Sequence, residues 1–303
     1  MYKKYLVVVG ALLIQSCSIV GLFQANKKIE GDYVLELHPR DSHPVHDRSI
    51  NVIQGFASFE DGFFTSQTTA DTYLILNYID SKGDSQFATR FTVNSHAQDL
   101  SLEQISEDSL VLYTTIGAFD KDGASGIMTL GVKLPPKENG VRDMSKISVG
   151  MLEKYQLGYR NCTPTISTDN KKIALRSGNS IYFGNKEDVL SRNKDKISHF
   201  DISMEQLRGQ KGETLWFQGI AMDENNIYCL TGNGTIDSEK KIFVYNLNGE
   251  VVKKVKIEEK QMGRGSLKLE PEGLTIVDGN LYFLLMVKAK VGGNRKFMFK
   301  ANL

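Results

Sequence analysis

The stretch LEPEGLTIVDGNLYFLLM, residues 269–286, decides the fold class of this chain. Apolar residues alternate with polar ones through 274–277, an Asp-Gly-Asn turn signal follows at 278–280, and a second apolar run begins at Leu281. A two-residue alternation on the near side of an Asp-Gly turn predicts a β-hairpin, and helical spacing is absent. The hairpin is preceded by an acidic residue and a glycine, Glu272-Gly273.

The same pattern recurs four times upstream. In each copy a polar residue, usually Gln followed by Gly, precedes an apolar alternation, a polar turn and a second strand-like run. In the second copy Asp99 replaces the Gly, and the third copy is the weakest because Pro stands in place of Gln or Glu. The register residues that mark the five copies are Gln54, Gln98, Pro164, Gln218 and Glu272. They are separated by 44, 66, 54 and 54 residues, which suits four-stranded propeller blades of about 40–50 residues with outer loops of variable length.

Further strand candidates follow each hairpin. The most distinct lie at 241–245 and 251–257, on either side of a turn that contains Asn-Gly. Five units of about four strands each account for most of residues 50–303, and they predict an all-β protein with a single five-bladed β-propeller. A β-sandwich or a solenoid would share the alternation and stays an alternative. Because a propeller must join its first and last blades, we expect the C-terminal strand to pair with residues ahead of Gln54.

The N-terminal residues predict export. Two lysines at 3–4 precede an apolar run over 6–14, and a second apolar stretch covers 19–23. Three interpretations stay open: a signal peptide cleaved near Ala25, a lipoprotein lipidated at Cys17, and an uncleaved membrane anchor. All three place the rest of the protein outside the cytoplasm.

These features give three expected segments. Residues 1–25 are a signal peptide or a membrane or lipid anchor, 26–49 a linker, and 50–303 the propeller domain. The expected location is extracellular, with a lipid-anchored protein on the cell surface as the alternative.

The charge balance and the absence of familiar catalytic motifs limit the classes of function that the sequence supports. The chain has 37 basic and 36 acidic residues, a formal net charge of +1, so no basic surface for nucleic acid is evident. It has no GxSxG, HExxH, P-loop or GxGxxG motif, and we expect a non-enzymatic protein without a cofactor. No metal site is expected either, because His38, His43 and His46 lie in a Pro-containing segment typical of a surface linker. Cys162 and Cys229 occupy non-equivalent positions of adjacent units, and we expect two buried thiols without a disulfide.

The register residues are the candidate binding residues. The innermost strands of a propeller line its axis, so residues at equivalent starts gather at one end. This predicts a ring at a channel mouth, with His96 and Trp216 each two positions ahead of a Gln of the ring. The ring residues are Gln54, Gln98, Gln218 and Glu272.

Two roles for this ring stay open. Its side chains could bond neighbouring backbone and so close the propeller, since buried polar groups are hydrogen-bonded. Alternatively they could form a polar mouth for a ligand, where Trp216, the single tryptophan, would stack on a sugar ring while amides orient it. Trp216 could equally be a buried core residue.

Four segments together resemble the helveticin-type large (class III) bacteriocins: VIQGFASFEDGFFTSQ (52–67), NSHAQDLSLEQ (94–104), WFQGIAMDENNIYCLTG (216–232) and LEPEGLTIVDGNLYF (269–283). The propeller of that family is similar to those of teichoic-acid operon protein C and of some phage tail receptor-binding proteins. The resemblance covers about residues 50–303 and rests on the repeat pattern and the His96-x-Gln98 step. The third unit departs from it at Cys162-Thr163-Pro164, and so does the N-terminal export signal, which bacteriocins of this type need not carry.

The resemblance implies a secreted antibacterial protein that recognises a Gram-positive cell-wall polymer, teichoic acid or a related glycopolymer. A surface-anchored carbohydrate- or protein-binding propeller is the alternative. A calcium-dependent lactonase-like hydrolase shares the PEGLT phrase at 271–275, but such a site needs several carboxylate and Asn ligands at the channel, and Glu272 alone is insufficient.

Overall fold

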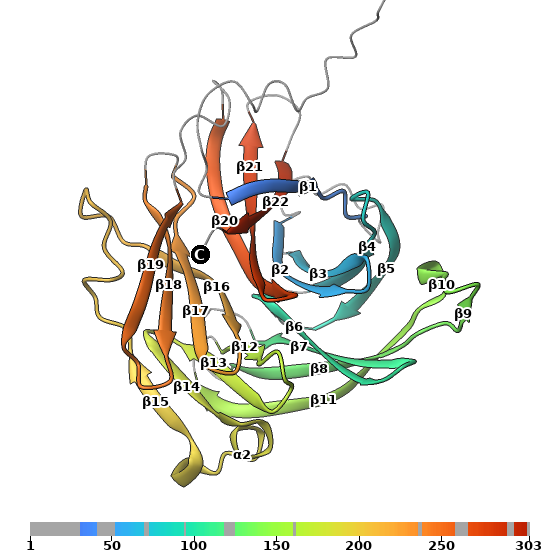
Figure 1. Ribbon diagram of the computed structural model, residues 1–303, viewed down its shortest axis with the longest axis horizontal. Coiled ribbons are helices and arrows are strands. Elements are labelled where there is room, and N and C mark those ends of the chain that lie inside the picture. Colours follow the sequence, from blue (N-terminus) through green and yellow to red (C-terminus); the bar gives the residue numbers. More distant parts are fainter. Residues whose placement is uncertain are drawn as a thin grey trace, which may run out of the picture.

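The computed structural model describes residues 31–40, 52–69, 73–93, 95–117, 125–159, 162–235, 238–257, 266–289 and 294–301. The predicted export signal at 1–25 lies outside these residues. Five antiparallel sheets of four strands each surround a common centre, as Figure 1 shows, so the predicted five-bladed β-propeller is confirmed. In the part of the chain that the structure describes, the longest helix has five residues, far fewer than a membrane-spanning helix needs.

The strands of each blade are given in order from the innermost, next to the axis, to the outermost. Blade 1 consists of β2 (Val52–Phe59), β3 (Gly62–Thr69), β4 (Tyr73–Ile79) and β5 (Ser85–Thr92). Blade 2 consists of β6 (Leu100–Ser106), β7 (Ser109–Ile116), β8 (Ser125–Lys133) and β11 (Ser148–Tyr159). The small hairpin β9 (Lys137–Glu138) and β10 (Val141–Arg142), followed by the 3-10 helix η1 (Met144–Lys146), lies between its two outer strands in sequence.

The third and fourth blades follow the same order. Blade 3 consists of β12 (Thr163–Ile166), β13 (Lys172–Ser177), β14 (Ser180–Asn185) and β15 (Ser198–Asp201), with α2 (Lys186–Leu190) and η2 (Lys194–Lys196) before its outer strand. Blade 4 consists of β16 (Trp216–Met222), β17 (Asn226–Gly232), β18 (Lys240–Asn246) and β19 (Val251–Ile257).

Blade 5 closes the ring with strands from both ends of the propeller sequence. From the axis outward its strands are β20 (Ser266–Val277), β21 (Asn280–Ala289), β22 (Asn294–Ala301) and β1 (Gly31–Glu36). β1 runs antiparallel to β22, from Gly31 opposite Ala301 to Glu36 opposite Phe297. The expected pairing of the C-terminal strand with residues ahead of Gln54 is therefore confirmed. It also corrects the expected linker at 26–49, because residues 31–36 cover the edge that β22 would otherwise expose.

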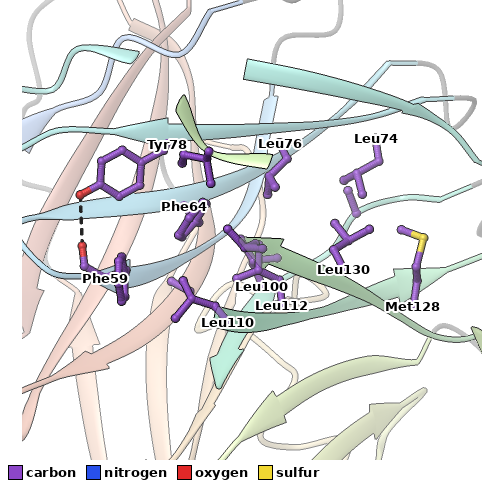
Figure 2. Close-up of a cluster of buried hydrophobic side chains, with 14 of the residues drawn as sticks. Phe59, Phe64, Leu74, Leu76, Tyr78, Leu100, Leu110, Leu112, Met128 and Leu130 are labelled. Atoms are coloured by element: carbon purple, nitrogen blue, oxygen red, sulfur yellow. Dashed lines mark hydrogen bonds between the residues drawn. The ribbon is translucent and has the colours of Figure 1, made fainter. Parts of the chain in front are cut away.

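One buried apolar cluster lies at each of the five interfaces between blades, counted over the described residues. The cluster between blades 1 and 2, drawn in Figure 2, brings Phe64 and Leu76 against Leu112 and Met128. The cluster between blades 5 and 1 is smaller and includes Leu37, which follows β1. Since each fully buried large apolar side chain contributes roughly 1.5–3 kcal/mol, these five clusters stabilise the ring at every joint.

The predicted repeat is visible in the register of the inner hairpins. In β2 and β16 the pairing skips the Gln of the step, between Ile53 and Gly55 and between Phe217 and Gly219, and in β20 it skips the Gly, between Glu272 and Leu274. A β-bulge at each Gln-Gly or Glu-Gly step therefore bends the strand as it approaches the axis.

The two cysteines of the propeller are core residues. Cys162 and Cys229 are both reduced and buried, as the sequence predicted. Burial raises the pKa of the Cys162 thiol to about 12, so neither the position nor the protonation state suits a reactive thiolate.

Candidate functional site

Neighbouring inner strands approach each other closely in the middle of the propeller. A Cβ added to Gly55 would lie 2.3 Å from the Cα of Asp99, and one added to Gly219 would lie 2.7 Å from the carbonyl carbon of Gly273. A Cβ on Gly273 would in turn lie 3.1 Å from the Cα of Gly55. Only glycine allows so close an approach, so inner strands of blades 1, 2, 4 and 5 touch here. We call Gly55, Asp99, Gly219 and Gly273 the axial seal.

Asp99 connects the blades through its hydrogen bonds. Its carboxylate is fully buried and accepts from the backbone N–H groups of Leu100 (3.0 Å), Ile220 (2.5 Å) and Leu274. Its own N–H donates to the Gln54 carbonyl at 2.9 Å. Burial raises the pKa of Asp99 well above its usual range, and the three N–H donors act in the opposite direction. One side chain thus bonds to three blades at the centre of the ring.

The predicted ring residues lie next to this seal and are buried. The exposed fractions are 7% for Gln54, 4% for Gln98, 8% for Gln218 and 3% for Glu272. Gln98 closes the ring: its Nε2 donates to the Phe217 carbonyl at 3.0 Å, and its Oε1 accepts from the Thr163 hydroxyl at 3.4 Å. The first of the two predicted roles therefore describes Gln98.

Gln54, Gln218 and Glu272 differ from Gln98. All three side chains are more than nine-tenths buried, and among the described residues only Glu272 of the three has a polar atom that is both wholly enclosed and without a hydrogen-bond partner. The Glu272 Oε2 atom is wholly buried, and burial, together with the nearby Glu270, raises the pKa of Glu272 well above its usual range. A buried polar group without a partner costs about 1–3 kcal/mol and needs an explanation such as a bound ligand or water.

The three residues sit at one level of neighbouring strands. The glycines that follow them, Gly219, Gly273 and Gly55, contact one another in that order across blades 4, 5 and 1. Two amides and a carboxyl group whose pKa is raised by burial supply hydrogen-bond donors and acceptors. Such a set can bind a polar, uncharged group.

Both aromatic candidates belong to the same end of the axis, where the inner strands begin. Trp216 opens β16 and is 62% exposed, so it is not a core residue. His96 is half-buried on the segment that leads into β6, and its backbone N–H donates to the Gly117 carbonyl at 3.3 Å. We call this end, with its four ring residues, His96 and Trp216, the register end.

A cavity of about 280 Å³ lies at the opposite end, where the inner strands finish. All five inner strands line it, through Ser58, Ser101, Thr165, Ala221 and Thr275 among others. None of the residues predicted from the sequence takes part. We call it the axial cavity. Serine and threonine at alternate positions of a strand are ordinary in any half-exposed sheet, so the sequence carried no signal that they converge.

No metal centre is apparent in the described residues, where no group of three or more His, Cys, Asp or Glu side chains is placed to hold an ion. The described side chains at the register end include amides, a carboxyl group and the exposed Trp216 indole, which can form hydrogen bonds and stack on a ring.

Similar structures are tail fibres and glycoside hydrolases. The tail fibre of Staphylococcus aureus phage P68 has a TM-score of 0.63 at 21% identity, over 90% of this chain and 52% of the fibre. This chain thus spans about half the length of that fibre. The GH43 endo-arabinanase from Bacillus licheniformis has a TM-score of 0.47 at 11% identity, over 83% of this chain and 93% of the enzyme, which is too distant to bear on function.

Comparison by sequence gives a family. No curated protein sequence matches the chain. Residues 57–290 match the model of a family described as the phage 5-bladed beta propeller receptor binding platform domain, which supports the phage-tail part of the resemblance noted above. Because the match covers well over half of the chain and includes strands of every blade, the chain belongs to the family of phage five-bladed β-propeller receptor-binding platform domains.

Proposed function

We propose that this chain is a non-enzymatic binding protein that recognises a glycopolymer of the Gram-positive cell wall at its register end. The observation that carries the proposal is the Glu272 carboxyl group, whose Oε2 atom is wholly buried without a hydrogen-bond partner at the end of the axis that also carries the amides of Gln54 and Gln218. A fold keeps such groups at a cost in stability, and a ligand that satisfies them would recover that cost on binding.

The chemistry of these groups suits sugar or polyol hydroxyls. Each amide offers two donors and an acceptor, and a protonated carboxyl offers one donor. A hydroxyl can both donate and accept, so it matches either partner. None of the ring residues is cationic, and we therefore assign the contact to hydroxyl groups of the polymer and leave its phosphates in solvent. The exposed Trp216 supplies an aromatic face for a sugar ring.

The family supports the class of partner. Its description names receptor binding by phage, and the tail fibre with a similar fold belongs to a phage of a Gram-positive bacterium. A surface structure of such a cell is thus the expected partner, and teichoic acid is the hydroxyl-rich polymer that fits the ring.

Antibacterial action is a further consequence that we propose. The resemblance to helveticin-type bacteriocins and the N-terminal apolar runs at 6–14 and 19–23 support a secreted protein that inhibits the cells it binds. Growth inhibition by the purified protein tests this. Mass spectrometry of the native N-terminus separates cleavage near Ala25, which leaves Asn26 first, from lipidation of Cys17.

Wall binding is tested with purified cell walls before and after teichoic acid is extracted. We expect the native protein to bind intact walls and to lose binding after extraction. The double variant Trp216→Ala with Gln218→Ala should bind about tenfold more weakly or worse. Leu152→Ala, which truncates a similarly exposed side chain on the outer strand of blade 2, is the control and should bind normally. Binding that survives in the double variant, or no binding by the native protein, would overturn the proposal.

A further inference from the structure

The axial cavity is a separate compartment from the register end. The axial seal lies between them, where the buried Asp99 side chain of blade 2 accepts hydrogen bonds from the backbone of blades 4 and 5. The axial cavity lies on the side where the inner strands end. Its chemistry can differ from that of the wall polymer.

The floor of the axial cavity is a set of oriented hydroxyl groups. The Ser101 hydroxyl donates to Thr165 Oγ1 at 3.2 Å and accepts from the Ile166 N–H at 3.2 Å, so its orientation is fixed. The Thr165 hydroxyl is 3% exposed and accepts that bond, yet within the described residues no acceptor receives its own hydrogen. It is thus a buried donor that lines the cavity and is available to a ligand.

An acidic pocket adjoins the cavity. It has a volume of about 340 Å³ and shares Thr168, Ile276 and Asp278 with the axial cavity. Its lining contains three carboxylates, Asp223, Glu224 and Asp278, and no cationic side chain.

Two of the three carboxylates are held in place by neutral donors. Asp223 accepts from the Tyr228 hydroxyl at 2.6 Å, and Glu224 accepts from the Thr168 hydroxyl at 2.9 Å. Lys172 reaches the Glu224 main-chain carbonyl at 3.0 Å rather than its carboxylate. Among the described residues, the Asp278 side chain has neither a hydrogen-bond partner nor an ion pair. The pocket therefore keeps an excess of negative charge, which attracts cations and repels phosphate.

We propose that the axial cavity and this acidic pocket together bind an amino sugar, whose ring hydroxyls contact Thr165 and Ser101 while its ammonium lies beside Asp278. The Ser101 and Thr165 hydroxyl groups would hydrogen-bond the ring hydroxyls, and the carboxylates of the acidic pocket would attract the ammonium. A cavity of about 280 Å³ is at the small end of ligand sites, roughly 300–1,000 Å³, which suits a single ring. This site is independent of the wall-binding role of the register end.

Glucosamine is the probe, followed by NMR and by calorimetry. We expect it to bind with a Kd on the order of 1 mM, to shift the backbone amides of Ser58, Thr165 and Thr275, and to leave the indole of Trp216 unchanged. N-acetylglucosamine, which lacks the charge, and glucosamine 6-phosphate, which adds a dianion, should bind at least about fivefold more weakly.

Two substitutions test the assignment to residues. Asp278→Asn should lower the affinity for glucosamine at least about fivefold, and Asn tolerates the φ of +48° at this position. Asp195→Asn, which removes the same charge from an exposed site on η2, should bind normally. Thr165→Val should weaken all three sugars alike.

Four results would overturn the proposal. The first three are equal binding of glucosamine and N-acetylglucosamine, normal binding by Asp278→Asn, and amide shifts confined to the register end. Absence of saturation at about 50 mM glucosamine, a concentration far above the Kd of a specific site, would also overturn it.

Discussion

The two ends of the propeller axis use polar side chains in opposite ways. At the register end the Glu272 Oε2 atom is wholly buried without a hydrogen-bond partner, whereas at the axial cavity Ser101 and Thr165 bond each other and line the cavity. The first arrangement lowers the stability of the fold until a ligand arrives, and the second costs it little. A substitution that removes the unpaired group at the register end should therefore raise stability, whereas one at the axial cavity should change stability little.

The axial seal lies between the two ends. We expect its disruption to change the free energy of unfolding more than any other substitution considered below. Gly55→Ala would place a Cβ 2.3 Å from the Asp99 backbone, which cannot move without shifting blade 2. We expect the free energy of unfolding to fall by about 3 kcal/mol or more, the upper range for overpacking, or the variant to give no soluble protein. Chemical denaturation measures this free energy.

Gly150→Ala is the matched control for that loss. Gly150 lies on β11 with nothing within 4 Å of its added Cβ. Its free energy of unfolding should stay within about 0.5 kcal/mol of the native value. Equal losses for the two variants would mean that the seal is not a close contact.

Asp99→Asn is expected to have the next largest effect. The amide keeps the size of the side chain but points an N–H group at the backbone donors of Ile220 or Leu274, which the carboxylate now satisfies. A loss of about 2–3 kcal/mol follows from the unsatisfied donors. Asp195→Asn, at an exposed position, controls for the lost charge, and a loss at Asp99 no greater than at Asp195 would contradict the role of Asp99 in joining the blades.

Glu272→Gln should stabilise the protein. Blades 1 and 4 carry Gln at this position, and an amide cannot ionise. The pKa of Glu272 in the folded protein is raised above the ordinary value of 4.5, so below pH 4.5 the carboxyl group is protonated in both states and ionisation does not destabilise the fold. As the pH rises from 4.5 toward the folded pKa, the free energy of unfolding falls by up to about 1.4 kcal/mol per pH unit.

The measurement for Glu272→Gln is the difference in unfolding free energy between variant and native protein as a function of pH. We expect a variant advantage of about 1 kcal/mol or more at pH 7 that shrinks toward pH 4. An advantage that is constant with pH, or absent, would mean that Glu272 is not a buried acid.

Trp216→Ala should change stability least. The side chain is 62% exposed at the start of β16, so its removal is expected to shift the unfolding free energy by less than about 0.5 kcal/mol. Thermal unfolding checks this. A large loss would show that Trp216 supports the fold, and its use as a binding reporter would then fail.

The sequence predicted the blades because three of the five inner strands repeat one local step. Gln54-Gly55, Gln218-Gly219 and Glu272-Gly273 all coincide with β-bulges beside the axis. The turn at 278–280 joins β20 to β21 with Val277 opposite Asn280, as expected for a tight hairpin.

Other features depend on distant contacts and were not predictable. β1 is a strand only because β22, far along the chain, leaves an edge for it, so its local sequence reads as linker. The substitution of Gly by Asp99 was visible in the repeat, but its bonds to Ile220 and Leu274 come from the closed ring. The difference between Gln98 and the other ring residues likewise follows from where Phe217 and Thr163 lie.

The most direct test of the wall-binding role compares the affinity of Glu272→Gln for teichoic-acid-bearing walls with its stability in the same buffer at pH 7. The same comparison is made with Glu272→Leu, which removes both the donor and the acceptors of the side chain, whereas Gln keeps groups that can bind a hydroxyl. We expect Glu272→Leu to be at least as stable as the native protein, because it removes a buried polar group without a partner, and to bind walls at least about tenfold more weakly. Glu187→Leu, at an exposed position of α2, should bind walls normally. A Glu272→Leu variant that keeps its stability and binds walls as well as the native protein would contradict the claim.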